Sequence, residues 1–238
     1  MSDEGTREGS TLSALLRANR IIIVSGTGTG VGKTIVTAAL AALAAADGQR
    51  VAVVKPAQTG IDTGEETDLE TVRRLSGVTD LHELARFPDP LSPEAAARTA
   101  GLSPLDLAAA ARHIGDLAAS RELVLVEGAG GLLVRYDPAG GTIADLAGLL
   151  DAPVLVVTTA GLGTLNHTAL TLEALATRGL RCAGVVIGSW PARPELAERS
   201  NLVDLPHLAA GVVGRLPEGA GQLGREEFLA AVRSNLSF

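Results

Sequence analysis

The sequence of 238 residues contains very little cysteine and few aromatic side chains. Its one cysteine, Cys182, excludes an internal disulfide and a metal site built from several cysteines. Aromatic residues make up 2% of the chain and apolar residues 46%, so the core must consist of closely packed Ala, Val, Leu and Ile. A chain of this length suits one domain that buries a sizeable core without disulfides.

The chain also has no excess of positive charge and no long apolar run. Its 20 Lys and Arg residues against 27 Asp and Glu give a net charge of −7, which argues against nucleic-acid and membrane partners. No run approaches the roughly 18 apolar residues of a membrane-spanning helix. Residues 1–10 have neither the basic start nor the apolar centre of a secretory signal. We expect a cytoplasmic protein with a flexible N-terminal segment over residues 1–19, in which 11–19 form a short helix.

Apolar strands alternate with helical stretches along the rest of the chain. The strand candidates are apolar at nearly every position, as in strands buried on both faces. They span residues 21–25, 51–55, 123–126, 153–159, 182–187 and, more weakly, 212–216. Helices are expected at 33–46, 67–75, 93–99, 104–119, 142–150, 164–177, 195–202 and 226–232. This alternation predicts a single α/β domain over residues 20–238, with a mostly parallel sheet covered by helices on both faces. Ligands of such folds bind beyond the carboxyl ends of the strands.

A glycine-rich segment follows the first strand and reads Gly-Thr-Gly-Thr-Gly-Val-Gly-Lys-Thr over residues 26–34. Gly-Lys-Thr at the start of a helix is a phosphate-binding signature: backbone N–H groups and Lys33 contact phosphates, and the Thr34 hydroxyl contacts Mg²⁺. The usual spacing would place the first glycine at Thr27, and Gly26 is one residue too early. The alternative is an ordinary glycine-rich turn, but the strand–loop–helix context favours nucleotide binding. The predicted contacts are Gly28, Thr29, Gly30, Val31, Gly32, Lys33 and Thr34.

Charged side chains end two further strands. Lys55 ends the second, where it is either a second cation at the phosphates or a lysine that reaches solvent at the sheet edge. Glu127 ends the third and is followed by glycines, as a magnesium ligand in a nucleotide enzyme would be; a structural Glu–Lys pair is the alternative. Asp68 begins a helix, a position where a carboxylate is usually structural.

A second anion site is predicted after the fourth strand, where residues 161–167 read Gly-Leu-Gly-Thr-Leu-Asn-His. Gly163 and Thr164 begin a helix, and the first N–H groups of a helix lack partners within it. His167 has no neighbouring carboxylate in the sequence, so a structural role is favoured over acid–base catalysis.

Together these segments resemble the dethiobiotin synthetase family. The matching residues are 26–34, 55–60, 67–68, 125–131 and 162–167, in the family's order, and the family's P-loop has the same extra residue. The resemblance implies a P-loop NTPase-like homodimer with a seven-stranded sheet. It implies a ligase of biotin biosynthesis that converts 7,8-diaminononanoate, CO₂ (or bicarbonate) and ATP into dethiobiotin, ADP and phosphate, with Mg²⁺. One substrate amine becomes a carbamate, its oxygen attacks the γ-phosphate, and the second amine closes the ring on the carbamic-phosphoric anhydride.

The resemblance also implies roles for individual residues. The catalytic set is Lys33, Lys55 and Thr59. The magnesium ligands are Thr34, Asp68 and Glu127, and the nucleotide site also includes Glu127, Gly128 and Gly130. The substrate contacts are Thr29, Lys55, Thr59 and, reaching from the partner subunit to the substrate carboxylate, Gly163, Thr164, Leu165 and Asn166. Replacing either lysine is expected to abolish turnover and to leave folding intact.

The chain departs from the family at the base pocket. Many members have an Asn after the fifth strand that reads adenine, whereas this chain has Gly188-Ser189-Trp190. The resemblance places the base near Gly188, Ser189, Pro217, Glu218 and Gly219. We therefore expect relaxed base selection, with CTP or another nucleoside triphosphate serving as well as ATP.

Two other functions are weighed against this one. The first is a dimerising ATPase switch, like the partitioning and cell-division ATPases. Those carry an additional P-loop lysine, which residues 27–30 lack, and often a basic amphipathic tail, which 226–238 lack. The second is a small-molecule kinase or an amidotransferase relative, which leaves residues 55–60 and 162–167 unexplained together.

Overall fold

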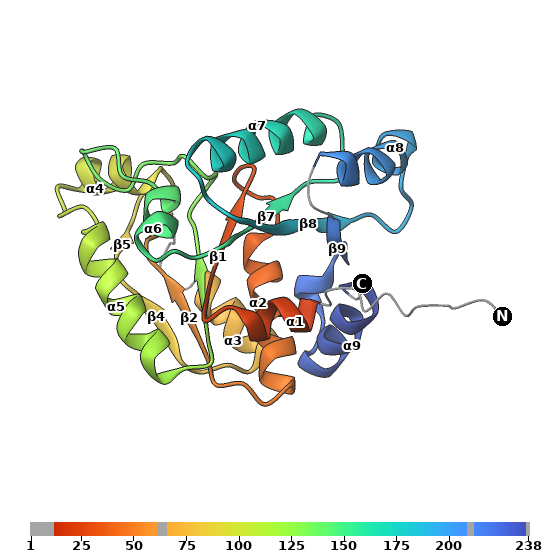
Figure 1. The fold of residues 1–238 in the computed structure, drawn as a ribbon, viewed down its shortest axis with the longest axis horizontal. Helices are drawn as coiled ribbons and strands as arrows, with labels where there is room; N and C mark the ends of the chain where they lie inside the picture. Colours follow the sequence, from red (N-terminus) through yellow and green to blue (C-terminus); the bar gives the residue numbers. More distant parts are fainter. Residues whose placement is uncertain (1–11, 61–65, 209–211, 237–238) are drawn as a thin grey trace.

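A seven-stranded sheet forms the centre of the molecule in the computed structural model, which describes residues 12–60, 66–208 and 212–236 (Figure 1). Its order is β4–β2–β6–β1–β7–β8–β9, and every pairing is parallel. The strands are β1 (Ile21–Gly26), β2 (Val51–Lys55), β4 (Leu81–Glu83), β6 (Leu123–Glu127), β7 (Val154–Thr158), β8 (Cys182–Trp190) and β9 (Val212–Pro217). Two short strands, β3 (Gln58–Thr59) and β5 (Arg86–Phe87), pair separately. The predicted fold class and strand number are confirmed.

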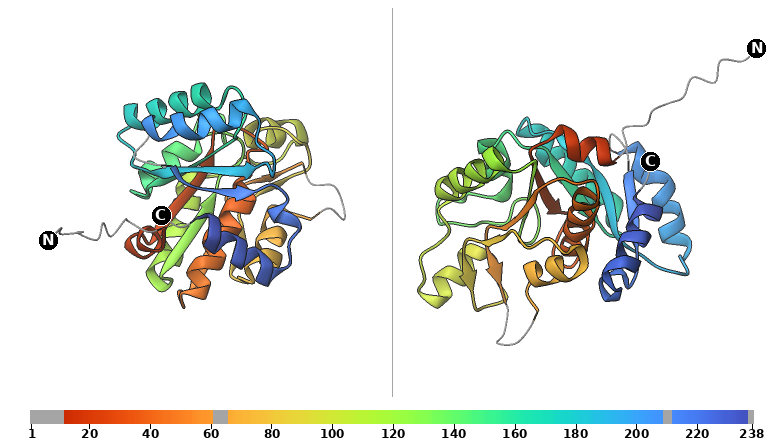
Figure 2. Two further views of the ribbon diagram at one scale, coloured as in Figure 1. Left: turned by 90° about the vertical axis from the view of Figure 1, so that its right-hand side faces the viewer. Right: turned by 90° about the horizontal axis from the view of Figure 1, so that it is seen from below.

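Helices cover both faces of this sheet (Figure 2). One layer contains α1 (Leu12–Ala18), α2 (Lys33–Ala46), α3 (Asp68–Ser76) and α9 (Arg225–Asn235). The opposite layer contains α4 (Pro93–Ala100), α5 (Leu107–Ser120), α6 (Ile143–Leu149) and α7 (Thr164–Thr177). The helix α8 (Leu196–Asp204) lies beside α7, and 3₁₀ turns occur at Leu205–His207 and Ala220–Gln222.

The continuous apolar character of the strands follows from these two layers. Along β1, Ile22 and Val24 pack into the core on the side of α2, and Ile23 packs into the core on the side of α5 and α6. Successive side chains of a strand point to opposite faces, so a strand with a helix layer on each face needs apolar residues at every position.

The alanine-rich helix α2 shows how the core closes with few aromatic residues. Nearly all of its side chains from Val36 to Ala44 are fully buried. Small side chains allow close approach, so α2 packs against α1, α3, α9 and the strands at once. The amino end of α2 is thereby fixed beneath the carboxyl end of β1, at the centre of the sheet.

Several element boundaries differ from the expectation. The edge strand β4 was not predicted, because three residues that include a histidine carry no clear apolar pattern. Strand β8 continues to Trp190, past the predicted end at residue 187. Helix α5 begins at Leu107 rather than 104, because the Asp106 carboxylate accepts a hydrogen bond of 2.8 Å from the N–H of Ala109 and caps the helix there.

The short N-terminal helix is confirmed as α1. Its Leu12 and Leu16 are buried in the core beside α2, so residues 12–18 pack onto the domain rather than extend as a flexible segment. Residues 1–11 of that predicted segment lie outside the described residues. Within the described ranges, no helix is long and apolar enough to cross a membrane.

Candidate active site

The P-loop between β1 and α2 curls around the amino end of α2. Gly32, the residue before the helix, has a φ of 95°, a conformation that favours glycine. Lys33 is 7% exposed, and its ammonium folds back over the loop to donate a hydrogen bond of 2.8 Å to the Gly28 carbonyl. The first N–H groups of α2 therefore face the same space as a lysine, as phosphate binding requires.

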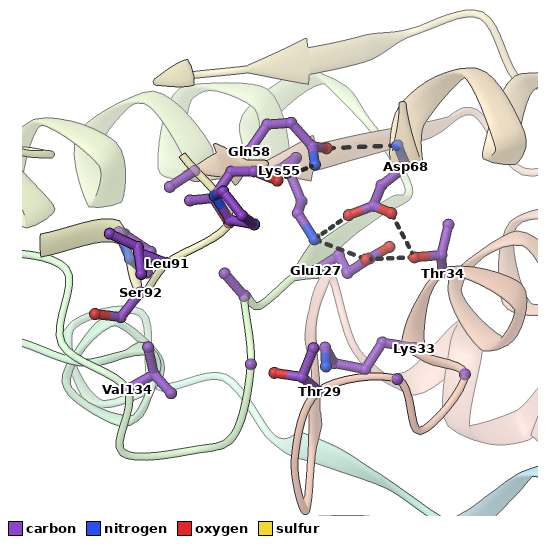
Figure 3. Close-up of a pocket in the computed structure, with 18 of the residues that line it drawn as sticks. Thr29, Lys33, Thr34, Lys55, Gln58, Asp68, Leu91, Ser92, Glu127 and Val134 are labelled. Atoms are coloured by element: carbon purple, nitrogen blue, oxygen red, sulfur yellow. Dashed lines mark hydrogen bonds and ion pairs between the residues drawn. The ribbon is translucent and has the colours of Figure 1, made fainter. Parts of the chain in front are cut away.

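Four polar side chains from four elements meet in front of this loop (Figure 3). Strands β2 and β6 are neighbours in the sheet, and their last residues, Lys55 and Glu127, form an ion pair of 2.8 Å. Lys55 also pairs with Asp68, at the start of α3, at 2.5 Å. The Thr34 hydroxyl lies 2.9 Å from both Asp68 Oδ1 and Glu127 Oε1. The structure thus brings together Lys55 and all three predicted magnesium ligands.

This arrangement fits a magnesium ion. The hydroxyl of Thr34 and the carboxylates of Asp68 and Glu127 are the hard oxygen ligands that Mg²⁺ prefers. The ion pair between Glu127 and Lys55 matches the structural role that was the alternative to metal binding. The second carboxylate oxygen of Glu127, Oε2, is nevertheless buried without a hydrogen-bond partner among the described residues. A buried carboxylate oxygen without a partner is costly, and a bound cation would satisfy it.

Burial and mutual attraction shift the charges of this cluster. Burial and then the charge of Lys55 lower the pKa of Lys33 to about 8. Burial alone would also lower the pKa of Lys55, but Glu127 and Asp68 outweigh it and raise that pKa. Burial raises the pKa of Glu127. For Asp68 the ammonium of Lys55 outweighs burial, and the pKa is lowered. Lys33 is thus the cation with no carboxylate of its own, and an incoming phosphate would stabilise its charge.

A cavity of about 780 Å³ opens in front of the P-loop and the cluster. Lys33, Lys55 and Thr59, the predicted catalytic set, all line it. So do the predicted residues Thr29, Gly30, Gly32, Thr34, Asp68, Glu127 and Gly130. The remaining lining residues were not predicted: Ile35, Ala57, Gln58, Pro90, Leu91, Ser92, Pro93, Ala129 and Val134. In Figure 3, Leu91 and Ser92 lie across the cavity from Lys33 and Thr34. The cavity therefore has a charged end at the P-loop and a more apolar end at residues 90–93.

The unpredicted wall residues carried little local signal. Residues 87–93 contain three prolines, a composition typical of a loop, but nothing in the sequence indicates that this loop faces the P-loop. Gln58 had a weak signal, because it lies within the segment 55–60 that was singled out; its Oε1 accepts a hydrogen bond of 3.4 Å from the N–H of Asp68.

The predicted carboxylate segment 163–166 does not line this cavity. The N–H of Thr164 donates to the Gly161 carbonyl at 3.3 Å, and Thr164 is 1% exposed. The N–H groups of Leu165 and Asn166 have no partner in the described part of the chain. These two N–H groups are therefore the free donors at the start of α7.

The residues predicted for the base lie on two adjacent segments at the ends of β8 and β9. The Trp190 carbonyl accepts a hydrogen bond of 2.8 Å from the N–H of Glu218. Gly188 packs directly against the P-loop, and a side chain there would overlap the carbonyl oxygen of Val31. A side chain at Gly32 would likewise come within 2.9 Å of the Gly188 carbonyl. Close backbone contact explains the glycine at 188.

We expect Glu127→Gln to raise the Mg²⁺ concentration for half-maximal activity by about tenfold, because an amide offers one neutral oxygen where the carboxylate offers two. The measurement is phosphate release against Mg²⁺ concentration. Glu83→Gln is the matched control, because Glu83 ends the nearby strand β4 but bonds to Arg86 at 2.6 Å. An unchanged metal titration for Glu127→Gln would make this carboxylate structural.

The sheet order and the glycine-rich loop before α2 define a P-loop nucleoside triphosphatase fold. The cell division ATPase MinD of Pyrococcus furiosus superposes with a TM-score of 0.54 at 22% identity, over 90% of each chain. MinD of Pyrococcus horikoshii, solved with Mg-ADP, gives 0.55 at 20% identity, over 89% of this chain and 86% of that one. At these identities the likeness shows the fold alone.

Within that class, the family follows from sequence comparison. The chain belongs to the ATP-dependent dethiobiotin synthetases, and residues 20–222 match the family model described as an AAA domain. The synthetase BioD of Frankia casuarinae is 65% identical over 90% of this chain and 91% of its own. That of Parafrankia sp. is 64% identical over 91% of each chain, and that of Streptomyces coelicolor is 56% identical over 89% of each.

Proposed function

We propose that this protein joins 7,8-diaminononanoate, CO₂ and a nucleoside triphosphate to give dethiobiotin, the nucleoside diphosphate and phosphate. The observation that carries this proposal is the meeting of Lys33, Lys55 and an oxygen-ligand set around one cavity that also has a more apolar end. The charged end suits the phosphates and the carbamate, and the apolar end suits an aliphatic diamine. The cell-division switch is disfavoured, because relatives at 56–65% identity are synthetases and the switch proteins share only the fold.

In this proposal the protein works by positioning and by charge, without a protein nucleophile. Lys33 and Lys55 neutralise the negative charge of the γ-phosphate and the carbamate, which is largest as the phosphoryl group transfers. Thr59 orients the diamine so that the carbamate oxygen lies in line with the phosphate. Magnesium, held by Thr34, Asp68 and Glu127, would supply further charge neutralisation at the phosphates when bound.

The proposed active unit is a homodimer in which the start of α7 completes the partner's site. The support is twofold. The N–H groups of Leu165 and Asn166 are free, yet the segment 163–166 does not line the cavity of its own chain. Leu162, just before that helix, is 88% exposed, as a residue in a subunit contact would be in the isolated chain.

Phosphate release with Mg²⁺, bicarbonate and ATP, with and without 7,8-diaminononanoate, tests the reaction. We expect release to depend on the diamine and to yield a product with the mass of dethiobiotin. Release that is indifferent to the diamine would favour the ATPase switch. Phosphate retained on the product would indicate a kinase.

We further propose that the base is selected weakly, so that CTP or another nucleoside triphosphate serves as well as ATP. The support is at Gly188, where contact with the P-loop leaves no room for the side chain that reads adenine in many family members. Base contacts then come from backbone groups and from the exposed Ser189 and Glu218, which favour no single base strongly.

The nucleotide preference is measured as kcat/KM for each triphosphate with the diamine at saturation. We expect at least one other triphosphate within tenfold of ATP or better. Preference for ATP over every other triphosphate by tenfold, which corresponds to about 1.4 kcal/mol, would contradict this. We also expect Gly188→Asn to lower kcat/KM for all triphosphates rather than to create selectivity for ATP, because the new side chain displaces the P-loop.

A further inference from the structure

The segment 159–163, which leads from β7 into α7, is held by a side chain that the proposed reaction does not use. Asn201 of α8 is 6% exposed, and its Nδ2 donates to the carbonyls of Ala160 at 2.8 Å and Gly161 at 2.9 Å. An amide NH₂ group has two hydrogens, so both are committed to this segment. Helices α7 and α8 lie side by side in Figures 1 and 2, and Asn201 joins α8 to the loop that begins α7.

Three threonine hydroxyls hold the same segment from the protein interior. The Thr158 hydroxyl, at the end of β7, lies 2.7 Å from Thr164 Oγ1 and 2.9 Å from Thr168 Oγ1, and all three residues are buried. It also lies 3.4 Å from Thr27 Oγ1 of the P-loop. The Thr164 hydroxyl donates to the Thr159 carbonyl at 2.6 Å.

The direction of these hydrogen bonds follows from counting hydrogens. A hydroxyl has one hydrogen and two acceptor positions. The Thr164 hydroxyl donates its one hydrogen to the Thr159 carbonyl, so the Thr158 hydroxyl must donate to Thr164 Oγ1. The Thr168 hydroxyl must then donate to Thr158 Oγ1. The Thr158 hydroxyl is therefore the central link of a chain that ends on the backbone of the segment.

These bonds orient the free donors at the start of α7. Gly163 precedes the helix with a φ of 90°. The Gly161 carbonyl accepts from both Asn201 and the N–H of Thr164. Asn201 therefore holds the turn that sets the direction of the first helical residues, among them Leu165 with its unpartnered N–H. Thr158 holds the same first turn through the Thr164 side chain.

We propose that Asn201 and Thr158 are positioning residues for the substrate carboxylate. They hold the N–H groups of Leu165 and Asn166 in the arrangement that binds it. This inference rests on the proposed function, because it needs the start of α7 to receive the carboxylate of the diamine. Neither residue lines the cavity, and neither touches the reacting groups.

Two variants remove these bonds with little change of shape elsewhere: Thr158→Val and Asn201→Ala. We expect each to raise KM for the diamine about five- to tenfold, because each removes the side-chain hydrogen bonds that order the binding segment. For Asn201→Ala, whose side chain bonds only to Ala160 and Gly161 within the described ranges, we expect kcat and KM for the triphosphate to change less than twofold. This expectation is not extended to Thr158→Val, because the Thr158 hydroxyl also lies 3.4 Å from Thr27 Oγ1 of the P-loop. Thr158→Ser keeps the hydroxyl and should restore KM. Thr37→Val is the matched control, because Thr37 is fully buried and its hydroxyl has no partner in the described part of the chain.

A diamine with a methyl group in place of the carboxylate separates positioning from general damage to the fold. Dissociation constants for both diamines are measured by calorimetry for the wild-type protein and each variant. The variants should lose affinity for 7,8-diaminononanoate and match the wild-type protein for the carboxylate-free diamine. An equal loss for both ligands, or no loss for either, overturns the inference. A wild-type protein that binds and converts no diamine overturns the proposed function instead.

Mixed dimers test which site the positioning serves. Lys33→Ala subunits and Asn201→Ala subunits are co-expressed with different tags, and the heterodimer is purified. One of its two sites has an intact Lys33 from one subunit and an intact α7 segment from the other. We expect that site to show the wild-type KM for the diamine. If the heterodimer instead shows the raised KM of the Asn201→Ala protein, the start of α7 serves the site of its own subunit. That result would overturn the inference that Asn201 positions the carboxylate site of the partner.

Discussion

Lys33→Ala is expected to lower turnover about a thousandfold or more, because a buried cation at a transferring phosphoryl group contributes on this scale. It should not lower the melting temperature. The Lys33 ammonium donates only to the neutral Gly28 carbonyl in the described structure, so its removal leaves no buried charge unpaired. Burial already opposes its charge, as the lowered pKa of about 8 indicates.

The measurements are kcat from diamine-dependent phosphate release and the melting temperature without ligands. Arg50→Ala is a surface control, because Arg50 pairs with Glu122 in an exposed ion pair far from the cavity lining; such pairs contribute little to stability. Turnover of Lys33→Ala near the wild-type rate would remove the proposed mechanism. A large loss of stability would mean that Lys33 has a structural partner in the free protein.

Lys55→Met is expected to abolish turnover and also to destabilise the protein. The Lys55 side chain is 4% exposed and that of Glu127 is 1% exposed. Removing one partner of a buried ion pair costs about 3–5 kcal/mol, which corresponds to a fall in melting temperature of roughly 10 °C for a chain of this size. The structure therefore changes the expectation from sequence, in which both lysines were replaceable without effect on folding.

The loss of stability in Lys55→Met should depend on pH. Without Lys55, burial raises the pKa of Glu127 further than it does in the wild-type protein. An acid whose pKa is higher in the folded state than in the unfolded state costs stability as pH rises through that range. The variant should therefore be destabilised less at pH 5 than at pH 8. Thermal melts at the two pH values measure this difference.

The double variant Lys55→Met/Glu127→Gln is the matched control for this effect. It removes both charges of the pair, so most of the lost stability should return, while turnover should stay abolished. Failure of the second substitution to restore stability would show that the Lys55–Glu127 pair is not the source of the loss. Turnover in the single variant would show that Lys55 does not act on the phosphates or the carbamate.

Some parts of the site could be predicted from sequence and others could not. The segment 26–34 could be predicted because its function depends on backbone N–H groups and glycines that are contiguous in the chain. The segment 163–166 was readable as a helix start for the same reason. The wall at residues 90–93 was not readable, because a loop of prolines carries no local sign of what it faces.

The residue at 188 shows how the two kinds of information differ. From sequence, Gly188 stood out because it lacks the side chain with which many family members contact the adenine base. In the structure it is also a packing position, where the backbones of β8 and the P-loop come too close for any side chain. The sequence shows that residue 188 has no side chain. The reason is the contact between Gly188 and Val31 of the P-loop, which are far apart in the chain.

The sequence by itself determined the alternation of buried strands and helices, because a strand covered on both faces must be apolar at every position. It also determined the phosphate loop, because that loop is built from consecutive residues. The family resemblance placed Lys55, Asp68 and Glu127 at one site, but only the tertiary structure shows that Lys55 pairs directly with both carboxylates, since this depends on β2 and β6 being neighbours in the sheet. Strand order is set by packing between distant segments, and no local pattern of residues records it.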